Sequence, residues 1–311
     1  MRDRMRYWIG MDIGGTTARM GIRLEGRTEI MNFSGTGCTL NSNSYETCRE
    51  RYRDITWKGL RSMGLEVKDC AGICVAASGI DNPAMKQQCR GLFLELGFSK
   101  DRLLVINDCE VLLHLKKEPG AVLLAGTGSI AMARHRDGTI VRRGGWGNLL
   151  SDEGSAFDIG VEVLRAAVNH LDGRLPCPAL YSLFYEAIPI REPLALNAYL
   201  LKNCANKAEV ARLAPLVEAA AGEGDVAALD IIERTSGKLC SLLESALAQS
   251  GETVKAMKEL GIPVVFWGSV MVKNERIRER TGQLLRSGLG LDFTTSQTTA
   301  LEYAVEAAKL L

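Results

Sequence analysis

The feature that most constrains the fold is an internal repeat, in which one pattern of strands and turns occurs twice at a spacing of 112 residues. Each copy has a buried strand ending in glycine, a turn of glycine and hydroxyl residues, a second strand, an acidic-glycine turn and a third strand. Five positions match at this spacing: Gly14 with Gly126, Thr17 with Ser129, Met20 with Met132, Glu25 with Asp137, and Gly26 with Gly138. Matching roles at a fixed spacing predict two related domains.

Strands and helices alternate along the rest of the first half. Residues 45–64 carry apolar groups at helical spacing, and buried strands are predicted at 71–78 and 102–108. This alternation is typical of a layered α/β domain. After residue 155 the chain becomes mainly helical, and the long stretch 207–224 has an amphipathic pattern.

Duplication predicts two domains around a cleft, with the two glycine turns facing each other across it. We expect the first domain to span residues 1–107, with the C-terminal helix 298–311 packing back on it. The second domain is expected at 108–297 and contains the helical insert.

The two glycine turns have the residue types needed to bind phosphate. Glycines let the backbone approach a phosphate with its N–H groups free, and threonine hydroxyls can donate to phosphate oxygens. Asp12, at the end of the first strand, suits the oxygen shell of Mg²⁺, often through water. Either turn alone could be an ordinary hairpin. The presence of such a turn in both copies of the repeat favours binding of the β- and γ-phosphates. The turn residues are Gly14, Gly15, Thr16 and Thr17 in the first copy, and Gly126, Thr127, Gly128 and Ser129 in the second.

Asp108 ends the strand LLVIND, at the edge of an α/β sheet where ligands usually bind. Phosphoryl transfer to an alcohol needs an acceptor for the hydroxyl proton, and a carboxylate can take this role. The alternative interpretation is that Asp108 caps the next helix, predicted to start near Glu110.

The segment Gly144–Ser155, GGWGNLLSDEGS, is the most specific of the chemistry-bearing segments. A tryptophan among three glycines suits no regular element and is typical of a ligand-binding loop. Trp146 can stack on a sugar face, and Asp152 can bind sugar hydroxyls or act as a helix N-cap. Two weaker candidates follow predicted strands: Ser78 with Gly79, and Gly268 with Ser269, where a nucleotide base could lie against the backbone.

Composition excludes several other functions. The chain has 38 Lys and Arg and 37 Asp and Glu, so its net charge of +1 gives no electrostatic reason to expect nucleic acid or membrane as a partner. Asp12 interrupts the apolar stretch after the basic start, so no signal peptide is expected. The nine cysteines form no C-x-x-C motif and predict packed, reduced thiols in a cytoplasmic protein.

Taken in order, D-x-G-G-T, the strand ending in Asp108, G-T-G-S, G-G-W-G-x-L-L-x-D-E-G-S and a late G-S-V resemble the N-acetylglucosamine kinase family, within the BadF/BadG/BcrA/BcrD ATPase group. The resemblance implies two actin-like (ribonuclease H-like) domains, a homodimer, and transfer of phosphate from ATP to the 6-hydroxyl of an amino sugar with Mg²⁺. It implies that Asp108 is the general base and that Asp12 orients the Mg²⁺ shell.

The resemblance also assigns the remaining positions. Thr16 and Thr127 would contact the phosphates, while Ser269 and the helix around Ala211 would border the adenosine. The sugar would be held by Asn41 (favoured over Asn43), Ser129, Gly145, Trp146 and Asp152.

Two positions depart from the family pattern. Ile130 stands where relatives that use N-acetylglucosamine can have a sugar-contacting asparagine, and Arg143 stands where a cysteine can precede the loop. N-acetylglucosamine therefore leads, with N-acetylmuramic acid or glucosamine as alternatives, and the added cation of Arg143 suits an acidic sugar.

Two interpretations from other classes remain open. An ATPase that activates a dehydratase would need cysteines to hold an iron–sulfur cluster, and no cysteine lies in a glycine turn, although Cys109 follows Asp108. A sugar sensor would usually carry an added DNA-binding segment, and no such segment is seen before residue 8.

Overall fold

The computed structural model describes residues 5–15, 17–80, 82–115, 118–188, 190, 192–203, 207–248 and 251–311. The chain forms two compact units, one of residues 1–117 with 298–311 and one of residues 118–297. Unit 1 thus ends after residue 117 rather than after residue 107. Asp108 and the short helix α3 (Val111–His114) belong to unit 1, where α3 packs against the C-terminal helix α13 (Ala300–Ala308).

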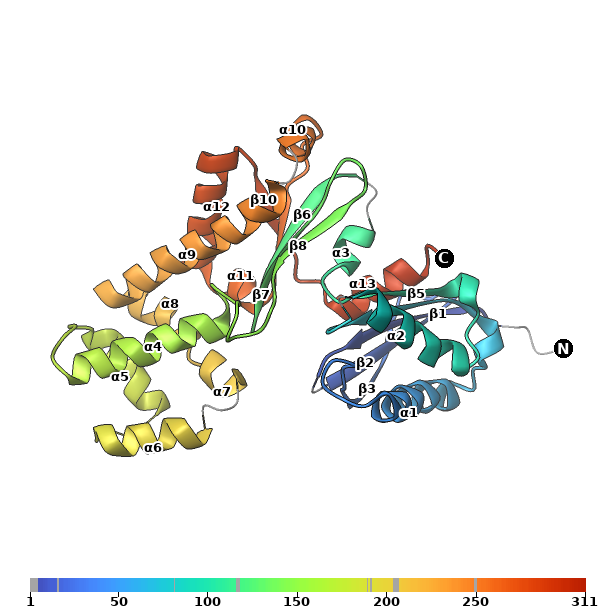
Figure 1. Ribbon diagram of the computed structural model, residues 1–311, viewed down its shortest axis with the longest axis horizontal. Helices are drawn as coiled ribbons and strands as arrows, with labels where there is room; N and C mark the ends of the chain where they lie inside the picture. The colour runs from blue at the N-terminus through green and yellow to red at the C-terminus, as the bar shows by residue number, and fades with distance from the viewer. Residues whose placement is uncertain are drawn as a thin grey trace. The chain divides into compact units, whose positions relative to one another are not determined.

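Unit 1 contains a five-stranded sheet with the order β3-β2-β1-β4-β5. The first three strands pair antiparallel, whereas β4 and β5 continue the sheet in parallel with β1. Figure 1 shows this sheet with its covering helices. The strands are β1 (Tyr7–Ile13), β2 (Thr17–Leu24), β3 (Met31–Thr36), β4 (Cys70–Ala77) and β5 (Leu103–Asn107).

Helices cover both faces of the unit 1 sheet. Helices α1 (Tyr45–Met63) and α2 (Pro83–Glu95) enclose the apolar core on one face, where alternate residues of β1 such as Met11 are fully buried. On the other face, α13 packs unusually close to the strands. A Cβ added to Gly10 would lie 2.4 Å from the backbone N of Val305, so only glycine permits this approach.

Unit 2 repeats the topology of unit 1. Its sheet has the order β10-β9-β6-β7-β8, in which β6, β7 and β8 pair antiparallel, and β9 and β10 extend the sheet in parallel with β6. The predicted duplication is therefore confirmed. The strands are β6 (Gly120–Ala125), β7 (Ser129–Arg134), β8 (Ile140–Gly144), β9 (Val264–Trp267) and β10 (Phe293–Thr295).

The spacing of 112 residues holds for the first strand of each copy but fails for the second. Met11 pairs with Met20, whereas Leu123 pairs with Ala131 rather than with Met132. The second glycine turn is one residue shorter, which shifts the following strand by one position and turns Met132 away from the core face. The predicted matches of Met20 with Met132 and of Thr17 with Ser129 are therefore wrong, because Ser129 stands opposite Ala125 as Ala18 stands opposite Ile13.

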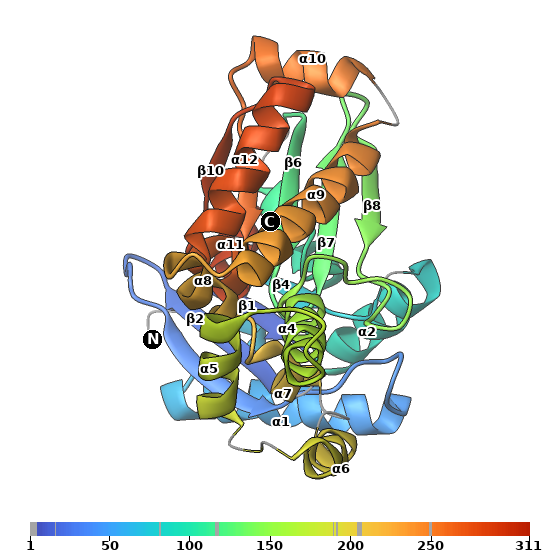
Figure 2. The same ribbon diagram turned by 90° about the vertical axis from the view of Figure 1, so that its left-hand side faces the viewer.

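The helices of unit 2 form most of its mass. Helix α9 runs along β6, β7 and β8, with α12 beside it (Figure 2). The predicted helical stretch 207–224 is broken into α7 and α8, because Pro215 lacks an N–H and begins a helix more readily than it continues one. The helices are α4 (Ala156–Leu171), α5 (Pro178–Ala187), α6 (Pro193–Asn203), α7 (Lys207–Ala211), α8 (Pro215–Gly222), α9 (Val226–Leu247), α10 (Gly251–Glu259), α11 (Ser269–Lys273) and α12 (Glu275–Leu289).

The eight described cysteines are free and buried, as the sequence predicts. Burial raises the pKa of Cys70, Cys74 and Cys89 to about 12, because the thiolate is disfavoured away from water. These thiols are therefore protonated packing groups at neutral pH. None of the helices in the described ranges has the length and apolar character that a membrane span requires.

Candidate active site

Unit 1 gathers several of the predicted site residues at one edge of its sheet. The parallel strands β1, β4 and β5 end together there, with Ile13 paired to Ala77 and Ala77 paired to Asn107. Ser78 follows β4 and donates to the carbonyl of Ile13 through its N–H, at 2.9 Å, and through its hydroxyl, at 3.3 Å. Ser78 thus ties two strand ends together at the edge where ligands bind in sheets of this type.

Asp12 lies near the end of β1 and pairs across the hairpin with Arg19, whose guanidinium is 3.1 Å from Oδ2. Burial raises the pKa of the Asp12 carboxyl above its ordinary value, and the charge of Arg19 opposes this shift. Arg19 is well exposed on the strand surface. The carboxylate therefore has a movable cation on one oxygen and keeps the other oxygen for a further contact.

Asp108 lies in the turn between β5 and α3 and is half-buried. Its Oδ1 accepts a hydrogen bond from the N–H of Cys109 at 2.9 Å. Helix α3 begins after Glu110, so Asp108 is not its N-cap and the capping interpretation is wrong. Glu110 in turn pairs with Lys86 of α2 at 2.9 Å, which anchors this turn to the body of unit 1.

The structure brings Asn41 and Gly79 together, although they are far apart in the sequence. A Cβ added to Gly79 would lie 2.7 Å from the amide group of Asn41, and Gly79 has a φ of +71°. The alternative residue, Asn43, accepts a hydrogen bond from the N–H of Thr39 with its side-chain oxygen. Asn43 therefore stabilises its own turn, whereas the side-chain oxygen of Asn41 accepts from the exposed hydroxyl of Ser42 at 3.1 Å.

The first glycine turn is open around its glycines. The N–H of Gly14 donates to the carbonyl of Thr17 at 2.9 Å, which closes the turn. A Cβ added to Gly15 would meet no atom within 4 Å, so nothing in the protein itself requires glycine there. Thr17 is exposed, and Thr16, predicted to contact phosphate, lies outside the described residues.

The second glycine turn, in unit 2, is fastened to the start of α4. The N–H of Gly126 donates to the carbonyl of Gly128, and the carbonyl of Gly126 accepts from the N–H of Ala156. Thr127 is exposed at the tip. A Cβ on Gly128 would lie 2.7 Å from Oδ1 of Asp152, whereas one on Gly126 would meet nothing closer than 4.0 Å. Gly128 is thus required by the protein itself, and Gly126 is not.

Asp152 is buried against the second glycine turn, and it is the only non-glycine residue with positive φ in the described ranges. Its Oδ1 accepts from the N–H of Ser129 at 3.1 Å, and its Oδ2 lies 2.6 Å from Nζ of Lys207. Ser155 caps α4, so the alternative role of Asp152 as N-cap is wrong. The hydroxyl of Ser129 donates to the carbonyl of Glu153, so it holds the loop to the turn.

Arg142 braces the loop that carries Trp146. Its guanidinium donates to the carbonyls of Gly144 and Gly145 and lies 4.8 Å from the centre of the Trp146 ring. The indole remains 62 % exposed, and a ring with free surface can stack on a sugar. Ile130 is only 6 % exposed and packs beneath Gly145, so it shapes the loop from below and offers little surface to a ligand.

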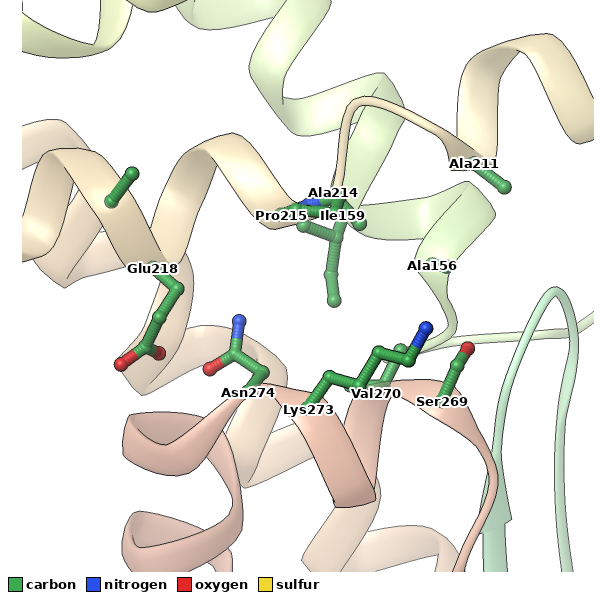
Figure 3. A pocket seen from close by; sticks show the side chains of 11 residues that line it. Ala156, Ile159, Ala211, Ala214, Pro215, Glu218, Ser269, Val270, Lys273 and Asn274 are labelled. Carbon is green, nitrogen blue, oxygen red and sulfur yellow. The ribbon is translucent and has the colours of Figure 1, made fainter.

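A pocket of about 440 Å³ opens beside the second glycine turn, within unit 2 (Figure 3). Ala211 and Ser269, both predicted to border a nucleoside, line it together. Gly268 has a φ of +91°, and a Cβ there would lie 2.5 Å from the carbonyl of Ala125, so only glycine can place Ser269 beside Gly126. The second glycine turn therefore lies next to an apolar pocket, with Ser269 between Gly126 and the pocket.

Three polar side chains at the site escaped the sequence interpretation. Lys207 lies 55 residues from Asp152, and no local pattern links them. Arg142 reads as one more cation on a strand. Asn274 precedes an amphipathic segment and has the pattern of an N-cap, which predicts a helix start but does not indicate a pocket.

The architecture is that of the duplicated actin-like ATPases. The solved structure of a candidate N-acetylglucosamine kinase from Chromobacterium violaceum has this fold, with a TM-score of 0.73 and 24% identity over 98% of this chain and 99% of that one. A model of the BadF/BadG/BcrA/BcrD ATPase family matches residues 9–290. The chain belongs to this family.

Two curated relatives resemble the chain in sequence. The N-acetylmuramic acid/N-acetylglucosamine kinase of Clostridium acetobutylicum is 29% identical over 238 residues, which are 76% of this chain and 77% of the relative. The N-acetyl-D-glucosamine kinase of Dictyostelium discoideum is 27% identical over 278 residues, 84% of each chain.

Proposed function

We propose that this protein transfers the γ-phosphate of ATP to the 6-hydroxyl of an amino sugar, with N-acetylglucosamine as the first candidate. The observation that carries the proposal is the continuity in unit 2 between the open glycine turn at Gly126 and the apolar pocket beside Ser269. A turn with open space at a glycine lets a phosphate chain approach the backbone, and an apolar pocket suits a nucleoside. The family and the names of both relatives support the same reaction.

In this proposal the two glycine turns hold the phosphates of ATP through backbone N–H groups and through the hydroxyls of Thr17 and Thr127. The carboxylate of Asp12 fits a Mg²⁺ shell, because it is a hard oxygen donor at a strand end whose only described partner is the movable Arg19. When bound, Mg²⁺ would neutralise charge on the phosphates. Asp12 would hold it through water.

Asp108 would accept the proton of the 6-hydroxyl as the hydroxyl oxygen bonds to the γ-phosphorus and the bond to the β-phosphate oxygen breaks. The products are the sugar 6-phosphate and ADP. Asn41, Trp146 and Asp152 would orient the sugar. Positioning and electrostatics supply most of the rate in such reactions, because the loose transition state demands little basicity.

N-acetylmuramic acid is the second candidate. Arg142 and Arg143 stand at the base of the Trp146 loop on β8. The guanidinium of Arg142 is bonded to the loop carbonyls, so Arg143 is the cation that could meet the carboxylate of an acidic sugar. Neighbouring residues of a strand point to opposite faces of the sheet. The side chain of Arg142 points to the face on which it braces the loop, and Arg143 lies on the same face as Ala131, its partner on β7. The Clostridium relative is named for both sugars.

The test is a coupled ADP-release assay with N-acetylglucosamine, N-acetylmuramic acid, glucosamine, N-acetylmannosamine and glucose. We expect release to depend on an amino sugar, with one equivalent of sugar phosphate formed per ADP. ADP release that no sugar stimulates would overturn the kinase proposal and favour an ATPase. A larger kcat/KM for N-acetylmuramic acid would make the second candidate the function.

The open glycines give a prediction that separates ligand binding from folding. Gly126→Ala and Gly15→Ala place a methyl group where the protein has free space, so the thermal midpoint should stay near wild type. If phosphate approaches these glycines, ADP affinity should fall by roughly tenfold or more, since one to a few kcal/mol of overlap is introduced. Calorimetry with ADP and thermal unfolding measure the two effects.

The matched control is Gly120→Ala, at the other end of β6, where an added Cβ also meets no atom within 4 Å. We expect it to change neither the midpoint nor the ADP affinity. Unchanged ADP affinity in both Gly126→Ala and Gly15→Ala would show that the phosphates do not lie at these turns.

A further inference from the structure

The pocket in unit 2 is apolar over most of its lining and carries a small set of polar side chains at one side. Its apolar part includes Ile159, Pro215 and Val270. The polar side chains are Glu218, Ser269, Lys273 and Asn274. Flat, mostly apolar ligands suit such a pocket, and the few polar groups fix their orientation.

Asn274 is held in one orientation by the helix that follows it. It is the N-cap of α12, and its Oδ1 accepts a hydrogen bond from the N–H of Ile277 at 3.1 Å. Because a backbone N–H needs an oxygen acceptor, the other terminal atom of the side chain must be the NH₂ group. Figure 3 shows this nitrogen facing the cavity.

The NH₂ group of Asn274 faces the cavity and has no acceptor among the described residues. The residue is 7 % exposed, and its backbone N–H and carbonyl are bonded to Val270 and Arg278. In a largely apolar pocket, a donor held in one orientation discriminates between ligands by the atom that they place opposite it. The pocket therefore selects a ligand with an acceptor atom at this point.

We propose that Asn274 reads the nucleobase, by donating a hydrogen bond to a ring nitrogen of adenine. The inference rests on the proposed function, since the nucleoside is taken to be that of ATP. Glu218 lines the same pocket, where Arg276 holds its carboxylate at 2.6 Å. Both oxygens accept from Arg276, Oε1 from the guanidinium and Oε2 from the backbone N–H at 3.3 Å, and a remaining lone pair could accept from the exocyclic amine.

Asn274→Asp changes the recognition chemistry and leaves the helix cap in place. Aspartate also accepts from the N–H of the third helical residue, and it is favourable at a helix N-terminus. The substitution replaces the NH₂ group with an oxygen, so a lone pair faces the ring nitrogen. We expect ADP to bind roughly 10- to 100-fold more weakly, with the thermal midpoint unchanged.

The experiment measures the Kd of ADP by calorimetry for wild type, Asn274→Asp and the control Asn82→Asp. Asn82 caps α2 in unit 1 in the same way, with its Oδ1 accepting from the N–H of Met85 at 2.8 Å. The control makes an identical chemical change at a helix N-cap remote in sequence from the pocket. It should bind ADP as wild type does.

A second arm uses ADP analogues in which one ring nitrogen, at position 1, 3 or 7, is replaced by C–H. Wild type should lose affinity for one of the three. Asn274→Asp should bind that analogue at least as well as it binds ADP, because the donor that favours the ring nitrogen is gone and the C–H removes the lone pair that would face the carboxylate. This loss of discrimination is not expected from a general loosening of the pocket.

The outcomes are distinct. Equal ADP affinity in wild type and Asn274→Asp, or the same analogue penalty in both proteins, would overturn the role of Asn274 and leave the kinase proposal standing. Failure of wild type itself to bind ADP would overturn the proposed function and the inference together. Because binding is measured, the result does not depend on which sugar is the substrate.

Discussion

Replacing Asp108 with asparagine is expected to lower sugar phosphorylation by roughly 10²–10⁴-fold, the contribution typical of a positioned general base. The amide has the size of the carboxylate but cannot accept the proton of the attacking hydroxyl. Its side-chain oxygen can still accept the hydrogen bond from the N–H of Cys109, so the turn after β5 should keep its conformation. Asp108 is proposed to contact the sugar hydroxyl and not ADP. ADP affinity should therefore stay within about twofold of wild type.

The measurement compares kcat at saturating ATP and sugar with the Kd of ADP. Asp101→Asn is the matched control, because Asp101 lies in the short 3₁₀ turn before β5, at the opposite end of the strand that leads to Asp108. Its exposed side chain has no part in the proposed chemistry, and its turnover should match wild type. Near-normal turnover in Asp108→Asn would exclude Asp108 as the base.

The duplicated architecture was predictable because each copy of the repeat consists of elements that depend on neighbouring residues in the sequence. Glycine turns, buried strands and polar hairpin tips follow from the residues themselves, and Gly26 and Gly138 do adopt positive φ at the tips. The register was harder to predict. A turn shorter by one residue reverses the faces of the following strand, and Met132 gave no sign of this because both faces of β7 are buried.

The sequence was sufficient to predict which glycines could bind phosphate. It could not show which of these positions require glycine because neighbouring protein atoms leave no room for a side chain. Gly126 and Gly128 look alike in the sequence. Only the fold shows that Gly128 makes room for the carboxylate of Asp152, whereas Gly126 faces open space. Likewise the sequence favoured Asn41 over Asn43 only through the family resemblance, whereas the fold places Gly79 against Asn41 and the N–H of Thr39 on Asn43.

Pairs formed by the tertiary structure had no signal in the sequence. Lys207 begins α7, after α4, α5 and α6 in the chain, and the packing of α7 on α4 brings it to Asp152. This packing is very close, since a Cβ on Gly160 would lie 2.1 Å from the carbonyl of Val210. The position of one cation thus depends on a glycine contact elsewhere on the same two helices.

Lys207→Met should destabilise unit 2 by about 3 kcal/mol, because it leaves the carboxylate of Asp152 buried without its cation. The Asp152 side chain is 4 % exposed, and the remaining described contact of its carboxylate is the N–H of Ser129. Lys207 itself is 32 % exposed, so its own desolvation costs little. Urea unfolding of wild type and variant, followed by circular dichroism, measures the loss.

Lys238→Met is the matched control. Lys238 is 33 % exposed and pairs with Asp158 at 2.8 Å, but the Asp158 side chain is 22 % exposed and can be hydrated when the lysine is removed. The loss should be about 1 kcal/mol or less, as for ordinary surface pairs. Equal losses of unfolding free energy in the two variants would mean that the burial of Asp152 does not strengthen its ion pair with Lys207.

The single variant Asp152→Asn and the double variant Lys207→Met with Asp152→Asn complete the cycle. An amide can still accept from the N–H of Ser129 and needs no cation, so the double variant should be more stable than Lys207→Met alone. Its KM for the sugar should nevertheless rise, because the carboxylate proposed to bind sugar hydroxyls is gone. Recovered stability with a weakened sugar KM would separate the structural role of Asp152 at the glycine turn from its role toward the substrate, whereas recovery of neither would contradict the charge argument.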